Sequence, residues 1–290
     1  MVRSKVVEKD VTNVPELPEV ETVRRTLIEL ASGKTIERVT VKWPNIIKRP
    51  EQVEQFCDAL VGQTIRDVER RGKFLKIVLD DYTMVSHLRM EGKYALHENA
   101  EEPDKHVHVF FHFTDGTELR YRDVRKFGTM HLFKKGEEDL FPPLIGLGPE
   151  PFDETFNPSQ LKMRIGKTSR KIKPVLLDQN VVVGLGNIYV DEALFRAGIH
   201  PERVASQLTD EEYEKLYEEI VATLQEAVKQ GGSTIRTYVN TQGQIGMFQQ
   251  QLYVYGRKGE SCKMCGTPIE KFVVGGRGTH ICPNCQPAKK

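Results

Sequence analysis

Four of the five cysteines stand in two pairs whose spacing suits a metal ion. The motifs CKMC and CPNC lie 16 residues apart and contain Cys262, Cys265, Cys282 and Cys285. Two such turns can place four thiolates around a tetrahedral Zn²⁺, and a redox pair or a disulfide is the alternative. Four thiolates fill the coordination sphere, so we predict one structural zinc ion. Cys57 stands alone and is expected to be a small buried hydrophobic residue rather than a nucleophile.

The segment between the two cysteine pairs is suited to phosphate. In TPIEKFVVGGRGTH, Arg277 lies among Gly275, Gly276 and Gly278 at the expected tip of a β-hairpin. Glycine lets the backbone approach a ligand closely, and the planar guanidinium of arginine matches the geometry of phosphate oxygens. We therefore expect zinc to hold a hairpin that presents Arg277 to a phosphate group.

Basic side chains are concentrated in three stretches, although the net charge of the 290 residues is only +1. Residues 161–174 contain six lysines and arginines and no acid, and further cations crowd residues 66–76 and 120–126. If these stretches converge in the fold, they form a positive groove suited to a polyanion such as DNA. Separate solvated surfaces are the alternative.

Composition excludes membrane proteins. Hydrophobic residues make up 39% and charged residues 29% of the chain, as in globular proteins. The sequence has no apolar run of the ~18–20 residues that a membrane span requires, and no signal-peptide pattern near its start. We therefore expect a cytoplasmic protein with no membrane partner.

Strand and helix patterns divide the chain into two main parts. Strands are predicted where β-branched and aromatic residues cluster, at residues 75–79, 83–88, 107–113 and 118–122. Such a run of strands is typical of a β-sandwich or barrel. One face of a helix ahead of them is formed by Val20, Val23, Leu27 and Leu30. After a linker rich in proline and glycine at 141–152, helical patterns return at 187–198 and 209–232.

Six motifs together resemble one family of DNA repair enzymes. The motifs are the four-cysteine hairpin and PELPEVE (15–21), RRGKFL (70–75), HLRMEG (87–92), YRDVRKFG (121–128) and GLGNIYVDEALF (184–195). Their order and spacing resemble the formamidopyrimidine-DNA glycosylase family, also called MutM. PELPE in place of PEGPE favours this family over the sister endonuclease VIII group, which prefers oxidised pyrimidines.

The resemblance implies an α+β fold and a bifunctional enzyme of base excision repair. The fold would comprise an N-terminal β-sandwich with an N-terminal helix, a helical domain with a helix-two-turns-helix element, and a zinc-bound β-hairpin. The predicted boundaries are a leader at 1–14, a catalytic domain at 15–145, a DNA-binding domain at 153–250 and a zinc finger at 251–290. The enzyme would excise 8-oxoguanine or formamidopyrimidines and then cut the strand by β- and δ-elimination. Its partner would be double-stranded DNA containing oxidised purines or abasic sites, bound by a monomer at the bacterial nucleoid.

The resemblance also implies five catalytic residues. Pro15 matches the nucleophile, whose amine forms an iminium with C1′ of the damaged nucleotide. Glu16 matches the acid and base that protonates the sugar ring oxygen, and Glu19 matches a second functional glutamate. Lys73 matches the residue of β-elimination, and Arg277 matches the residue of δ-elimination. An iminium is an electron sink that acidifies C2′, which is why an amine nucleophile suits both reactions.

Contacts with DNA are implied for further residues. The side chains that would enter the duplex are Met90, Arg125 and Phe127. The residues that would contact the DNA backbone are His106, Asn187, Lys167 and Lys173. Residues 233–249 match the loop that covers the flipped base. A non-catalytic DNA-binding protein, a pyrimidine-specific enzyme and a zinc-ribbon protein unrelated to DNA are the alternatives.

The sequence departs from the family ahead of Pro15. Fourteen residues precede this proline. A proline nitrogen within a chain is an amide nitrogen and cannot form an iminium. We therefore expect residues 1–14 to be absent from the active protein, either because translation starts at Val14 or because the leader is cleaved. An extended and inactive chain is the alternative.

Overall fold

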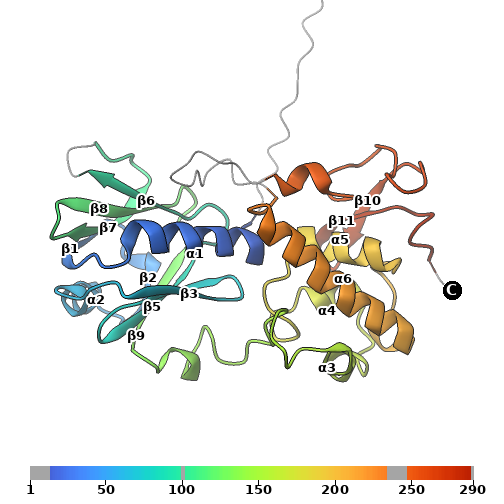
Figure 1. Ribbon diagram of the computed structural model, residues 1–290, viewed down its shortest axis with the longest axis horizontal. Helices are drawn as coiled ribbons and strands as arrows, with labels where there is room; N and C mark the ends of the chain where they lie inside the picture. The colour runs from blue at the N-terminus through green and yellow to red at the C-terminus, as the bar shows by residue number, and fades with distance from the viewer. Residues whose placement is uncertain (1–13, 99–101, 234–246, 289–290) are drawn as a thin grey trace, which may run out of the picture.

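The computed structural model describes residues 14–98, 102–233 and 247–288. It has two halves, with strands and α1 (Leu17–Ala31) on one side and helices and a short hairpin on the other (Figure 1). The N-terminal end of α1 lies at the junction of the halves (Figure 1). The predicted leader lies outside the described residues.

Two β-sheets form the first half, a four-stranded antiparallel sheet and a five-stranded mixed sheet. The four-stranded sheet has the order β1 (Ile36–Val41), β7 (Val107–Phe113), β8 (Thr117–Arg122) and β6 (Lys93–Glu98). The five-stranded sheet has the order β2 (Ile47–Arg49), β9 (Thr129–Lys134), β5 (Tyr82–His87), β4 (Phe74–Val78) and β3 (Asp67–Arg71). Residues of both sheets share one hydrophobic core, which confirms the predicted sandwich.

Helix α1 covers this core by the predicted face, with one difference. Val20, Val23 and Leu27 are buried, but the last buried position is Ala31 rather than Leu30. Residues 27 and 31 are four apart and lie on the same side of a helix, so the predicted Leu30 turns partly away. The sequence patterns missed a shorter helix, α2 (Val53–Leu60). It packs Cys57 against the same core, and this cysteine is partly rather than fully buried.

Helices form the second half. They are α3 (Pro158–Ile165), α4 (Ile172–Leu176), α5 (Asn187–Ala197) and α6 (Asp210–Lys229), and their apolar faces share a second core. Short 3-10 helices connect the elements: η1 (Pro44–Ile46), η2 (Glu138–Leu140), η3 (Ala205–Gln207) and η4 (Phe248–Gln251). Thr209 and Glu212 form the predicted capping box of α6. The hairpin of β10 (Glu270–Val274) and β11 (Arg277–Ile281) completes this half.

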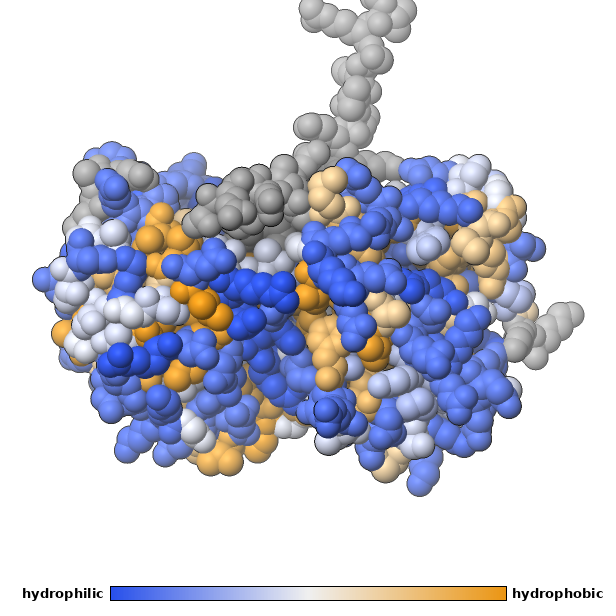
Figure 2. Space-filling view, viewed as in Figure 1, coloured by the Kyte–Doolittle hydropathy of each residue, from blue (hydrophilic) through white to orange (hydrophobic). Residues whose placement is uncertain are grey.

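Many cations of the three basic stretches are paired with acids. The pairs include Arg66–Asp80, Lys76–Glu138, Arg122–Asp104, Lys162–Asp210, Arg170–Asp178 and Lys171–Glu202. The face in Figure 2 is mostly hydrophilic, with hydrophobic residues in scattered groups. Among the described helices, none is long and apolar enough to cross a membrane.

Candidate active site

The carboxyl group of Glu16 joins the N-termini of two helices. Glu16 directly precedes α1, and its carboxyl oxygens accept hydrogen bonds from the backbone N–H groups of Gly186 (2.6 Å) and Ile188 (2.9 Å). These N–H groups lie at the start of α5 and have no partner within the helix. A Cβ atom at position 186 would lie 2.3 Å from Cδ of Glu16. The GLGN motif is therefore needed for this close approach.

Glu19 makes a second set of contacts beside the first. Its carboxyl group accepts hydrogen bonds from the backbone N–H of Glu16 (3.0 Å), the hydroxyl of Tyr189 (2.6 Å) and the backbone N–H of Ser233 (2.8 Å). Glu19 thus stabilises the start of α1 and also fixes the chain that follows α6. Sequence reasoning missed Tyr189 and Ser233, although Tyr189 lies inside the GLGNIY motif.

Lys73 is the third charged side chain of this cluster and comes from the same half of the molecule as α1. It lies in the turn between β3 and β4 and is half-buried. Burial lowers the pKa of Lys73, while the charges of Glu16 and Glu19 act in the opposite direction. Burial also raises the pKa of Glu16 to about 7, against the influence of the Lys73 ammonium. The two groups therefore have pKa values shifted toward each other, as acid–base pairs in enzyme sites often do.

Arg277 approaches this cluster from the hairpin. Gly275 and Gly276 form its turn with φ values of +56° and +75°, and the exposed Arg277 begins β11. Its charge adds to the effect of burial in lowering the pKa of Lys73. Pro15 precedes Glu16 and is half-buried. The structure thus brings all five predicted catalytic residues to one junction.

Lys173 does not lie at a surface that DNA could touch. Its side chain is fully buried, and its ammonium pairs with Asp191 at 2.6 Å and donates to the carbonyl of Gly278 at 3.1 Å. The predicted contact with the DNA backbone is therefore wrong for this residue, because the charge is used inside the fold. Asn187 also donates to the Gly278 carbonyl, at 3.0 Å. Both residues tie the hairpin to the helical half.

The other predicted DNA contacts occupy loops and turns. Phe127 is 51% exposed, and the guanidinium carbon of Arg125 lies 5.0 Å from the centre of its ring. Such exposure contradicts a role for Phe127 in core packing. Met90 and His106 are half-buried, and Lys167 is exposed after α3. The predicted loop at 233–249 falls mostly on 234–246, outside the described residues.

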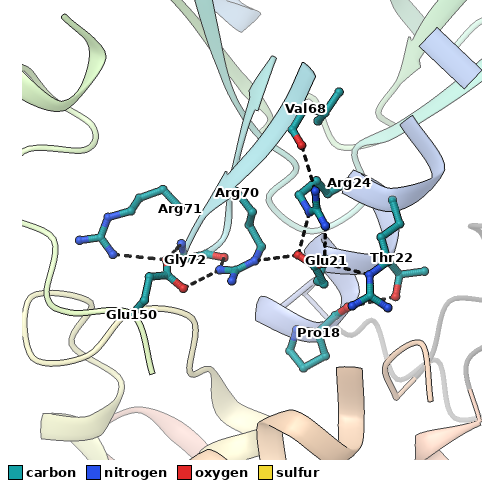
Figure 3. A network of polar contacts seen from close by, with 10 residues as sticks. Pro18, Glu21, Thr22, Arg24, Val68, Arg70, Arg71, Gly72 and Glu150 are labelled. Carbon is teal, nitrogen blue, oxygen red and sulfur yellow. Dashed lines mark hydrogen bonds and ion pairs between the residues drawn. The ribbon is translucent and has the colours of Figure 1, made fainter. Parts of the chain in front are cut away.

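A charged network fixes the turn that carries Lys73 (Figure 3). Glu150, in the linker between the two halves, accepts hydrogen bonds from the backbone N–H of Gly72 (2.5 Å) and from the guanidinium of Arg70 (2.9 Å). Arg70 also contacts Glu21 of α1 at 3.3 Å, and Arg71 contacts Glu150 at 3.3 Å. The linker therefore holds the turn that carries Lys73 against α1, the helix that Glu16 precedes.

Replacing Glu150 by Gln is expected to destabilise the protein by about 1–3 kcal/mol, because two partly buried guanidinium groups lose their shared carboxylate. Urea unfolding measures this loss. The matched control is Glu260→Gln, which removes an exposed partner of Arg257 and should change stability by less than about 0.5 kcal/mol. Equal stabilities of the two variants would show that the network does not stabilise the junction.

The four paired cysteines form a site that fits zinc. Their sulfur atoms all lie within 4.8 Å of one another, with Cys265 3.4 Å from Cys282 and 3.6 Å from Cys285. Tetrahedral Zn²⁺ with bonds of about 2.3 Å separates its sulfur ligands by roughly 3.8 Å, which agrees with this arrangement. Cys262, Cys265, Cys282 and Cys285 would therefore hold one structural zinc ion beneath the hairpin.

The variant Cys282→Ser is expected to lose the zinc and, with it, the order of the hairpin, because the metal supplies much of the folding energy of such small elements. Elemental analysis should find one zinc per chain in the wild-type protein and far less in the variant. Cys57→Ser, which changes the cysteine outside the site, should keep one zinc per chain. A Cys282→Ser protein with full zinc content would contradict the assignment.

The two halves, the hairpin and the buried glutamates correspond to the parts of a zinc-finger DNA glycosylase. Three family models match the chain. They are the formamidopyrimidine-DNA glycosylase N-terminal domain at residues 14–130, the formamidopyrimidine-DNA glycosylase H2TH domain at 147–239, and a zinc finger found in FPG and IleRS at 259–288. The chain belongs to the formamidopyrimidine-DNA glycosylase family, which acts in base excision repair.

Relatives and solved structures agree with this assignment. Formamidopyrimidine-DNA glycosylase of Bacillus licheniformis is 66% identical over 94% of this chain and 99% of its own length. The Bacillus subtilis enzyme is 64% identical over 95% of this chain and 100% of its own length. Lactococcus lactis Fpg bound to N7-benzyl-Fapy-dG DNA matches with a TM-score of 0.88 at 43% identity, over 94% of this chain and 100% of that one. Its complex with abasic-site DNA also matches with a TM-score of 0.88, at 44% identity, over 94% of this chain and 99% of that one.

Proposed function

We propose that this DNA glycosylase excises oxidised purines from duplex DNA and then cuts the strand at the abasic site it has made. The observation that carries the proposal is the buried Glu16, whose pKa is raised to about 7 beside Pro15 and Lys73. An acid with this pKa can donate a proton at neutral pH and take it back later. The Lactococcus relatives bound to Fapy-dG and abasic DNA support the substrate class.

In the first step, the free amine of Pro15 attacks C1′ and the bond from C1′ to the damaged base breaks. The base leaves with the electron pair of that bond and takes up the proton that the proline nitrogen loses. Glu16 protonates the ring oxygen O4′ as the sugar opens, and the electron pair of the C1′–O4′ bond moves to that oxygen. The proline nitrogen becomes a cationic iminium. The Pro15 nitrogen is an amide nitrogen as long as it is bonded to Val14, so the proposed active form lacks the bond between Val14 and Pro15.

In the second step, the iminium makes a proton on C2′ acidic, and its removal expels the 3′ phosphate by β-elimination. The lowered pKa of Lys73 gives its amine a larger neutral fraction, which suits it to accept that proton. Arg277 would stabilise the phosphate that leaves in the subsequent δ-elimination.

The damaged base must leave the helix before either step, since C1′ is inaccessible inside the stack. We propose that Met90 and Phe127 enter the space between base pairs and that Arg125 pairs with the base left behind. His106, Asn187 and Lys167 would contact the DNA backbone. All these groups come from one chain, so we propose a monomer that works on DNA at the nucleoid.

A panel of duplexes tests the proposed function. The chain beginning at Pro15 should excise 8-oxoguanine opposite cytosine and leave 3′ and 5′ phosphate ends at the gap. It should act much more slowly on thymine glycol opposite adenine. Preference for thymine glycol, or a gap without phosphate ends, would contradict the proposal.

The rate of excision should have a bell-shaped pH dependence. Above pH of about 7 the Glu16 carboxyl loses the proton that it donates, so the rate falls as pH rises. Below pH of about 8 the Pro15 amine becomes protonated and stops being a nucleophile, so the rate falls as pH drops. Single-turnover rates between pH 5 and 10 should therefore peak between about 7 and 8. A rate that increases steadily to pH 10 would exclude Glu16 as the acid.

A further inference from the structure

Two strained turns carry the residues proposed to enter DNA. Among the described residues, Arg89 and Lys126 are the two non-glycine positions with positive φ, at +54° and +59°. Arg89 precedes Met90, and Lys126 lies between Arg125 and Phe127. Residues other than glycine keep this conformation only where their surroundings impose it, and such strain is concentrated at functional sites. The surroundings of both turns should therefore contain the groups that impose it.

In each turn, a buried side chain accepts a hydrogen bond from the backbone N–H of the residue two positions later in the chain. Nδ1 of His87 accepts a hydrogen bond from the N–H of Arg89 at 2.9 Å. Asp123 accepts hydrogen bonds from the N–H groups of Arg125 at 3.0 Å and Gly128 at 2.8 Å. Asp123 is fully buried and His87 nearly so. Burial lowers the pKa of His87 to about 3, so the ring is neutral and its nitrogen can accept.

Both turns also rest on the same tyrosine. A Cβ atom added to Gly92, at the end of the first turn, would lie 2.2 Å from the hydroxyl oxygen of Tyr121. A Cβ atom added to Gly128, at the end of the second, would lie 1.7 Å from the same oxygen. Tyr121 is fully buried. The two turns are therefore packed side by side on one rigid ring.

We propose that His87, Asp123 and Tyr121 are positioning residues that hold both turns as one unit, ready to enter the duplex. The inference rests on the proposed roles of Met90, Arg125 and Phe127. The two turns already have their strained conformation in the free protein. Less conformational entropy is therefore lost when DNA binds, and the base stack opens faster. None of the three positioning residues needs to touch DNA.

The substitution Asp123→Ala tests this role when two substrates are compared. The 8-oxoguanine duplex requires a paired base to be expelled, whereas a duplex with an abasic site does not. Under single-turnover conditions, excision of 8-oxoguanine should fall at least tenfold and cleavage at the abasic site should stay within threefold of wild type. The matched control is Asp115→Ala, which removes the same kind of bond, to Thr117 at 3.0 Å, at the other end of β8. The control should stay within twofold on both duplexes.

A second pair of variants decides the matter if Asp123→Ala does not fold. His87→Asn keeps an oxygen that can accept from an N–H two residues ahead, and it should retain excision within threefold. His87→Leu has no acceptor and should lose excision at least tenfold, again with cleavage at the abasic site spared. Equal losses on both duplexes, or no loss in His87→Leu, would overturn the positioning role. If the wild-type chain that begins at Pro15 had no activity on either duplex, this would instead defeat the proposed function, and the inference with it.

Discussion

Glu16→Gln is expected to lower the rate of base excision by about 10²–10⁴-fold, the usual contribution of a positioned general acid. Gln has nearly the shape of Glu but carries no proton that it can give to the sugar oxygen. Its oxygen can still accept a hydrogen bond from Ile188, so the start of α5 should remain in place. Single-turnover excision of 8-oxoguanine measures the effect, with melting temperature as the test of folding.

The control for this variant is Glu29→Gln, on the exposed side of the same helix. It makes the same change from Glu to Gln within α1, at a distance from the junction, and should change the rate by less than twofold. A Glu16→Gln protein with excision within threefold of wild type would remove Glu16 from the reaction and leave its carboxyl group with a structural role alone.

The second large effect concerns the residues ahead of Pro15. A chain that begins at Pro15 is expected to excise bases at least about 10⁴-fold faster than one that keeps residues 1–14, because only the first has a nucleophilic amine. One preparation with a protease site placed at the junction provides both forms. Rates are measured before and after cleavage, and intact mass verifies each form.

Equal rates before and after cleavage would contradict the nucleophile as well as the expected loss of the leader. Removal of residues 1–14 could also raise the rate simply by clearing the site of extra chain. Cleavage to a chain that begins at Glu16 tests this alternative. That chain lacks the proline and should stay inactive, although it has no leader.

Sequence patterns located the strands β4, β5, β7 and β8 and the long helices α1, α5 and α6, because each depends on neighbours along the chain. They did not predict β1, β2, β3, β6 and β9. The limits of β7 match the prediction at both ends, and α6 begins at the predicted capping box. Contacts between distant residues were harder to predict. Lys173 belongs to a basic stretch, but it is buried in the interior, where it pairs with Asp191. A count of charges along the sequence cannot predict which of them are buried.

The motifs named the five residues that meet at the junction, but not Tyr189 and Ser233, which contact Glu19, and not the geometry of the site. The motifs placed Glu16 and Lys73 in one site through the family resemblance, whereas the reason for the GLGN glycines appeared only when Gly186 was seen against Glu16. Similarly, Gly92 and Gly128 belong to two separate motifs. Their common contact with Tyr121 depends on three strands meeting in space, which local periodicity does not specify.

The central claim is that the Pro15 amine forms a covalent bond to the damaged nucleotide. Borohydride reduces an iminium to a stable amine and so traps the protein on DNA. With a chain that begins at Pro15 and an 8-oxoguanine duplex, digestion and mass spectrometry should locate the trapped sugar on Pro15. An adduct on Lys73 or another lysine, or excision that proceeds without any trapped adduct, would contradict the account.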